Sequence, residues 1–133
     1  MKVRTRLKFS LAFLLLCCLA LSANAWDQEY VYRVKFAKGK SSAVMEDSII
    51  RATRNIYVLG ARKGQVMTAK VRSIENNAVI QIIDPKGKTP KGAGANGEDI
   101  TYWKGKLPLN GDYRIAVMGT RGNASFTLEV SIY

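Results

Sequence analysis

Apolar residues recur at every second position along most of this chain. The C-terminal segment is the clearest case, where Phe126, Leu128, Val130 and Ile132 alternate strictly with polar residues. A period of two is that of a β-strand with one buried face. The same alternation, or a short β-branched run, predicts strands at 30–36, 55–59, 65–74, 78–83, 112–118 and 126–132. Residues 44–51 are compatible with a helical turn, but we interpret them as a further strand.

Turn-forming residues separate these segments. Gly and Asn adopt the positive φ angles of tight turns, and Pro presets φ at a turn corner. Such residues occur between most of the predicted strands, and Asn110-Gly111-Asp112 predicts a hairpin. Seven or eight short strands with this spacing predict an all-β fold, as an antiparallel β-sandwich or barrel. The nearly continuous apolar run at 78–83 is typical of a buried central strand.

The segment 86–99 departs from this pattern. It contains four glycines and, apart from proline, no apolar residue larger than alanine. We predict a long flexible loop here, and loops of this length are often functional.

The first 25 residues are predicted to be a cleaved signal peptide. Four basic residues before position 9 precede an apolar run from Leu11 to Leu21, and Ala23-Asn24-Ala25 supplies the small residues of a cleavage site. The apolar run is short for a membrane span, which needs about 20 residues. We therefore expect a signal peptide at 1–25, a single domain at 26–133, and no stable membrane insertion after cleavage.

Cleavage would change both the cysteine content and the charge. Cys17 and Cys18 are the only cysteines and lie in the apolar run, where we interpret them as filler rather than lipidation sites. Absence of disulfides is unusual for a small secreted animal domain but unremarkable for a bacterial periplasmic protein, so we favour a Gram-negative bacterium as the source. Residues 26–133 carry seventeen basic and ten acidic side chains, a net charge of +7. A basic surface favours anionic partners.

The residue types present argue against catalysis. The chain has no histidine, the commonest general acid–base residue, and the cleaved domain would have no thiol nucleophile. The close carboxylate pairs, Glu46-Asp47 and Glu98-Asp99, are sequence neighbours, which point to opposite faces of a strand. Asp84, Glu98 and Asp99 offer too few oxygen ligands for a calcium site. We expect no enzyme activity, no metal and no cofactor, and scattered basic residues give no nucleic-acid-binding pattern.

Several segments resemble one bacterial family. Residues 36–43 (FAKGKSSA), 57–65 (YVLGARKGQ) and 107–117 (LPLNGDYRIAV) are similar to blocks of the periplasmic inhibitors of g-type lysozyme. Arg121 with Asn123-Ala124, before the closing strand, resembles the last turn of that family. The i-type lysozyme inhibitors and the pre-peptidase C-terminal domains of secreted bacterial proteases share this plan. Together the segments cover most of residues 26–133.

The resemblance implies an antiparallel β-sandwich that blocks the active-site cleft of a host or exogenous lysozyme with surface loops. The g-type enzyme is the expected target, with the i-type as an alternative. Arg121 would pair with the catalytic carboxylate, because a guanidinium can bond a carboxylate bidentately. Asn123, Asn96 and Tyr102 would replace sugar hydroxyls. Asn96-Gly97 with Tyr102 corresponds to a loop motif of the i-type inhibitors.

Other interpretations of these residues remain open. Arg121 could be a solvated turn residue. Trp103 could be an exposed anchor beside Tyr102, since aromatic residues and Arg dominate interface energetics, or it could pack in the core. The rival function is a non-catalytic envelope module, like a pre-peptidase C-terminal domain, that binds cell-wall glycan or an envelope protein. An exposed sheet edge would also let two copies pair as a homodimer.

Overall fold

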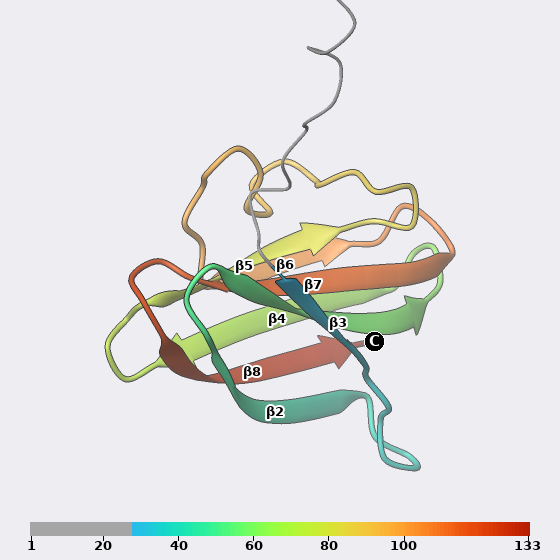
Figure 1. The fold of residues 1–133 in the computed structure, drawn as a ribbon. Coiled ribbons are helices and arrows are strands. Elements are labelled where there is room, and N and C mark those ends of the chain that lie inside the picture. Colours follow the sequence, from blue (N-terminus) through green and yellow to red (C-terminus); the bar gives the residue numbers. More distant parts are fainter. Residues whose placement is uncertain (1–27) are drawn as a thin grey trace, which may run out of the picture.

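The structure, a computed structural model, describes residues 28–133 as eight β-strands (Figure 1). The strands are β1 (Gln28–Arg33), β2 (Ser42–Ile49), β3 (Thr53–Ala61), β4 (Val66–Ser73), β5 (Ala78–Ile83), β6 (Tyr102–Lys106), β7 (Gly111–Gly119) and β8 (Ala124–Ile132). The predicted signal peptide, with Cys17 and Cys18, lies outside the described residues. Within residues 28–133 no helix is long and apolar enough to cross a membrane.

The strands form two four-stranded sheets packed face to face. One sheet has the order β1-β3-β7-β5 and the other the order β2-β8-β4-β6. The predicted β-sandwich is therefore confirmed. All pairings are antiparallel except that of β1 with β3, which is parallel with Gln28 opposite Thr53. β1 and β3 run the same way because the chain crosses to the other sheet to form β2 and then returns.

The core lies between the sheets and follows the predicted alternation. The inward positions of β7 and β8 are buried, with Tyr113, Ile115 and Leu128 all at 0% exposure. Met67, Ala69 and Val71 of β4 face the same interior, as their spacing predicts. A smaller apolar cluster lies on the other face of the β1-β3-β7-β5 sheet. It includes Ile56 and Ala116, which alternate with the core-facing residues of β3 and β7. Removal of the Leu128 side chain from such a core costs about 2–5 kcal/mol of folding stability.

The apolar run at 78–83 is an edge strand rather than the predicted central one. β5 pairs on one side with β7, and its other side is covered by the glycine-rich segment. The Ile82 amide donates to the Ala93 carbonyl oxygen (2.9 Å) and the Ile80 amide to the Ile100 carbonyl oxygen (2.9 Å). Ala93 is fully buried. The run is apolar because both faces of β5 are covered: Ile80 and Ile82 lie in the core between the sheets, and Val79 packs in the smaller cluster on the other face.

Gly94 allows this close approach. It has φ +89°, and a Cβ at this position would lie 2.3 Å from the Ile80 carbonyl oxygen. The segment predicted to be a flexible loop is thus bonded to β5 at Ala93 and, just past its end, at Ile100, and these bonds cover the edge of the sheet.

The sequence pattern missed β6. Its five residues, Tyr102 to Lys106, contain a glycine and two lysines, which obscure the alternation. The strand pairs only with β4, with Tyr102 opposite Lys70 and Trp103 opposite Ala69. The Asn110-Gly111 turn that follows does not form the predicted hairpin, because β6 and β7 belong to different sheets. It instead carries the chain across the sandwich.

Candidate partner-binding surface

Three connections meet at one end of the sandwich. Residues 50–52 join β2 to β3, residues 74–77 join β4 to β5, and residues 120–123 join β7 to β8. They lie together at the left of Figure 1. We call this the loop end; the opposite end holds the chain reversals at 34–41, 62–65 and 107–110.

Asn77 ties two of these connections together. Its side chain is 2% exposed. The Asn77 Nδ2 group donates to the backbone oxygens of Asn123 (2.9 Å) and Arg121 (3.4 Å). Its own carbonyl oxygen accepts from the Thr120 amide (2.9 Å). The 120–123 connection is therefore held on the 74–77 connection by the buried Asn77 side chain and by the Asn77 backbone carbonyl oxygen.

Arg121 is exposed on this support. Its Nη2 group donates to the Glu75 carbonyl oxygen at 2.6 Å. A guanidinium carries five N–H donors, so one bond to a neutral carbonyl leaves donors for a carboxylate and leaves the positive charge uncompensated. Asn123 is engaged more fully, because its Oδ1 accepts from the Arg51 amide (2.8 Å) and links the third connection.

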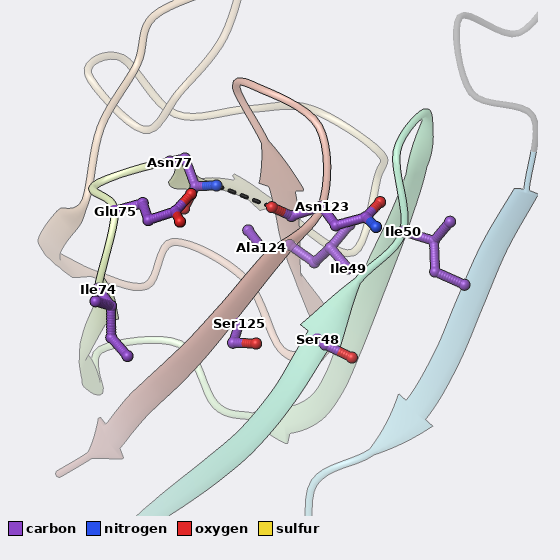
Figure 2. Close-up of a pocket in the computed structure, with 9 residues that line it drawn as sticks. All are labelled: Ser48, Ile49, Ile50, Ile74, Glu75, Asn77, Asn123, Ala124 and Ser125. Carbon is purple, nitrogen blue, oxygen red and sulfur yellow. Dashed lines mark hydrogen bonds between the residues drawn. The ribbon is translucent and has the colours of Figure 1, made fainter.

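A hollow of about 350 Å³ opens beside these residues (Figure 2). Ile50 and Ile74 stand on its two sides, 60% and 95% exposed, with the Asn77–Asn123 hydrogen bond at its rim. The two isoleucines add exposed apolar surface to this hollow, and apolar surface gathered in one place marks sites of contact with a partner. Neither residue is among those predicted from the sequence. The alternation of the preceding strands could have indicated them. Ile50 and Ile74 each fall at a position that continues the solvent-facing residues of β2 and β4.

Asn96 and Gly97 also reach the loop end. They line a second hollow, of about 330 Å³, together with Gly119 and Thr120, which immediately precede Arg121. Asn96 has φ +55° and Gly97 φ +79°, so the chain turns tightly there. The structure therefore brings together four of the six predicted site residues: Arg121, Asn123, Asn96 and Gly97.

Tyr102 and Trp103 occupy a different surface, on β6. Tyr102 is 53% exposed on the outer face of its sheet, where it lines a shallow hollow with Lys70 and Val44. Trp103 faces the other way and is half-buried against the core. Its indole lies over Gly105, where a Cβ would come within 2.3 Å of the ring. Strand alternation thus separates the two adjacent aromatic residues, and the core-packing interpretation describes the position of Trp103.

A polar contact supports the corner between β2 and β3, next to the loop end. Asp47 Oδ2 accepts from Asn55 Nδ2 (3.3 Å) and from the Tyr57 hydroxyl (3.4 Å). Burial, with a smaller contribution from the charge of Asp47, raises the pKa of Tyr57 to about 12. Tyr57 stays protonated at all physiological pH values and remains a donor to this carboxylate.

The acidic side chains of the loop end, Glu75, Glu98 and Asp99, are exposed. Residues 28–133 contain no group of three or more His, Cys, Asp or Glu side chains placed to hold a metal ion. This surface is suited to binding a partner. It presents an exposed guanidinium, amide groups and apolar side chains on connections that are hydrogen-bonded to one another.

The fold and the loop end are those of a β-sandwich protein that presents loops suited to binding a partner. Comparison with solved structures indicates which family of such proteins it resembles. Aeromonas hydrophila PliG, a periplasmic lysozyme inhibitor of g-type lysozyme, is similar, with 32% sequence identity, a TM-score of 0.67, and coverage of 80% of this chain and 98% of that chain. Salmonella Typhimurium PliG (21% identity, TM-score 0.63) and a mutant of the Escherichia coli protein (23%, 0.61) share the fold. Those matches cover 78% and 79% of this chain, and 98% of each of the two solved chains.

No protein-family model and no curated protein matches the chain. The structural match to the Aeromonas protein nevertheless covers nearly all of that protein and four fifths of this chain, at 32% sequence identity. The chain belongs to the family of periplasmic inhibitors of g-type lysozyme. The similar structures are those of inhibitors rather than enzymes.

Proposed function

We propose that this protein inhibits g-type lysozyme by covering the active-site cleft with its loop end. The observation that carries the proposal is the exposed Arg121 guanidinium, which three hydrogen-bonded connections hold beside a partly apolar hollow. We choose g-type lysozyme as the target because the similar Aeromonas protein is an inhibitor of that enzyme. The i-type enzyme is the second candidate, because Asn96-Gly97 reaches the same end.

The inhibitory contact has a charged centre and apolar flanks. Arg121 pairs with a carboxylate in the cleft, and partial exclusion of water strengthens such a charge-assisted bond. Ile50 and Ile74 bury apolar surface on either side, each contributing through area removed from water. Asn123 offers its NH₂ group and one acceptor site of Oδ1, because the Arg51 amide already occupies the other. Asn96 adds an exposed amide.

The site of action is the compartment to which the protein is exported. The basic n-region and apolar run of residues 1–25 direct export, and the solved inhibitors of this fold are described as periplasmic. We propose that the processed protein works in the periplasm, where it meets lysozyme that has crossed the outer membrane.

The test is inhibition of purified g-, i- and c-type lysozymes by the processed protein, with lysis of bacterial cell walls as the readout. We expect near-stoichiometric inhibition of the g-type enzyme. Arg121→Ala should weaken inhibition at least tenfold, and Arg121→Lys should restore only part of it because an ammonium cannot bond bidentately. Arg62→Ala is the matched control, since Arg62 is exposed at the opposite end.

Two outcomes would redirect the proposal. Equal inhibition by the parent and Arg121→Ala would remove Arg121 from the contact. No inhibition of any lysozyme would favour a non-catalytic envelope module, to be tested by binding to isolated peptidoglycan.

A further inference from the structure

The charges of this protein are distributed unevenly between its two ends. At the loop end, residues 50–52, 74–77, 94–101 and 120–123 together carry two basic and three acidic side chains. At the opposite end, residues 34–41, 62–65 and 84–91 carry eight basic side chains and one acidic one. The excess of positive charge in the composition is therefore concentrated away from the proposed lysozyme contact.

Seven side chains define what we call the basic end. All are exposed, and each belongs to a chain reversal or to the last residue of a strand at that end: Lys38, Lys40, Arg62, Lys63, Lys86, Lys88 and Lys106. Figure 1 shows these reversals on the side of the molecule that carries the C-terminus.

These seven cations are not neutralised within the fold. The three ion pairs among the described residues join Arg33 to Asp112, Arg54 to Glu29 and Arg72 to Glu129. Asp84, the acidic residue of the reversals, directs its Oδ1 to the backbone amides of Lys86 (2.8 Å) and Lys88 (2.9 Å).

We infer that the basic end docks electrostatically on an anionic phospholipid surface, so that the loop end faces away from the membrane. Six of the seven cations are lysines, whose flexible ammonium groups suit a diffuse layer of phosphates, whereas arginine would suit bidentate recognition of one fixed anion. They are spread over several separate reversals, which fits a broad surface. Tyr133, 60% exposed at the same end, has the amphipathic ring typical of membrane interfaces.

This contact needs neither a helix nor insertion. Juxtaposed basic residues are attracted to an anionic leaflet within about one screening length, near 10 Å at 0.1 M salt. The inference concerns a surface that the proposed inhibitory contact does not use, so it stands or falls separately from lysozyme inhibition.

Sedimentation with vesicles tests the docking. The processed protein should bind vesicles that contain phosphatidylglycerol at about 0.05 M salt, should be released at about 0.5 M salt, and should not bind pure phosphatidylcholine. Lys38→Gln/Lys63→Gln/Lys86→Gln should lose at least tenfold in affinity. The matched control, Lys70→Gln/Lys104→Gln/Arg114→Gln, removes the same charge from the sheet faces and should bind nearly as the parent does. Circular dichroism verifies that both variants fold.

Three results would overturn the inference. The first is no binding to the anionic vesicles at low salt. The second is an equal loss of affinity in the two triple variants, which would show that net charge alone matters. The third is equally tight binding to duplex DNA or isolated peptidoglycan, which would show a general attraction to polyanions.

Discussion

Asn77 acts at the scale of a single residue, because its buried amide supports the proposed contact without joining it. The side chain donates to two backbone oxygens of the 120–123 connection. We expect Asn77→Ala to lower the free energy of unfolding by about 1–3 kcal/mol, since the two carbonyl groups lose a buried donor. Asn77→Asp should cost more, because a carboxylate would face the same carbonyl oxygens. Urea unfolding measures both.

The inhibition assay adds a second readout for these variants. If Asn77 positions Arg121, Asn77→Ala should also inhibit lysozyme less well at temperatures where it is fully folded. Full inhibitory strength in the folded variant would show that the 120–123 connection keeps its conformation without the clamp.

Tyr57 predicts an alkaline limit to stability. Its pKa is raised from 10.0 to about 12 in the folded state, chiefly by burial. The unfolded chain therefore loses this proton first as the pH rises. The contribution to stability is complete below pH 10 and is lost between about pH 10 and 12.

Unfolding measured at several alkaline pH values tests this prediction. We expect the parent to lose about 2–3 kcal/mol over the interval because of Tyr57. The curve of Tyr57→Phe should be flatter, because it has no phenol to ionise. Parallel curves for the two proteins would contradict the raised pKa.

At the scale of elements, the 84–101 segment acts as a cover for the edge of β5. Gly94→Ala should destabilise the protein by about 1–2 kcal/mol or more, from the strain of a positive φ and from contact with the Ile80 carbonyl oxygen. Gly92→Ala is the matched control, since Gly92 has φ +75° but no neighbour within 4 Å of the added Cβ.

Hydrogen exchange locates the effect of these substitutions. The Ile80 and Ile82 amides, which donate to the covering segment, should exchange faster in Gly94→Ala than in Gly92→Ala. Equal exchange in the two variants would mean that backbone strain alone, and not the lost cover, explains the change.

The distribution of charge matters at the scale of the whole molecule. If the two ends act independently, a vesicle-bound inhibitor should still capture lysozyme. Sedimentation of anionic vesicles should then carry down more g-type lysozyme with the parent protein than with Arg121→Ala. Inhibition in solution by Lys38→Gln/Lys63→Gln/Lys86→Gln should equal that of the parent. Weaker inhibition by this triple variant would mean that the basic end contributes to the enzyme contact.

The sequence by itself determined the strands whose alternation is uninterrupted. Burial of one strand face requires a period of two, so the inward positions of β4, β7 and β8 followed directly from the order of residues. Arg121 and Asn123 could be predicted as site residues from their residue types and from the resemblance of their turn to that of a known family. β6 escaped detection because Gly105 and its lysines obscure the period.

Only the tertiary structure decided how distant segments meet. An apolar run such as 78–83 looks the same whether a strand or a returning loop covers its edge, and only the pairing with β7 and the bonds to Ala93 and Ile100 show that β5 is an edge strand. Local turn chemistry at Asn110-Gly111 specifies a reversal but not which sheet receives the next strand. The gathering of Arg121, Asn77, Ile50 and Ile74 at one end, with the lysines at the other, depends on contacts between residues far apart in the chain, which no local pattern encodes.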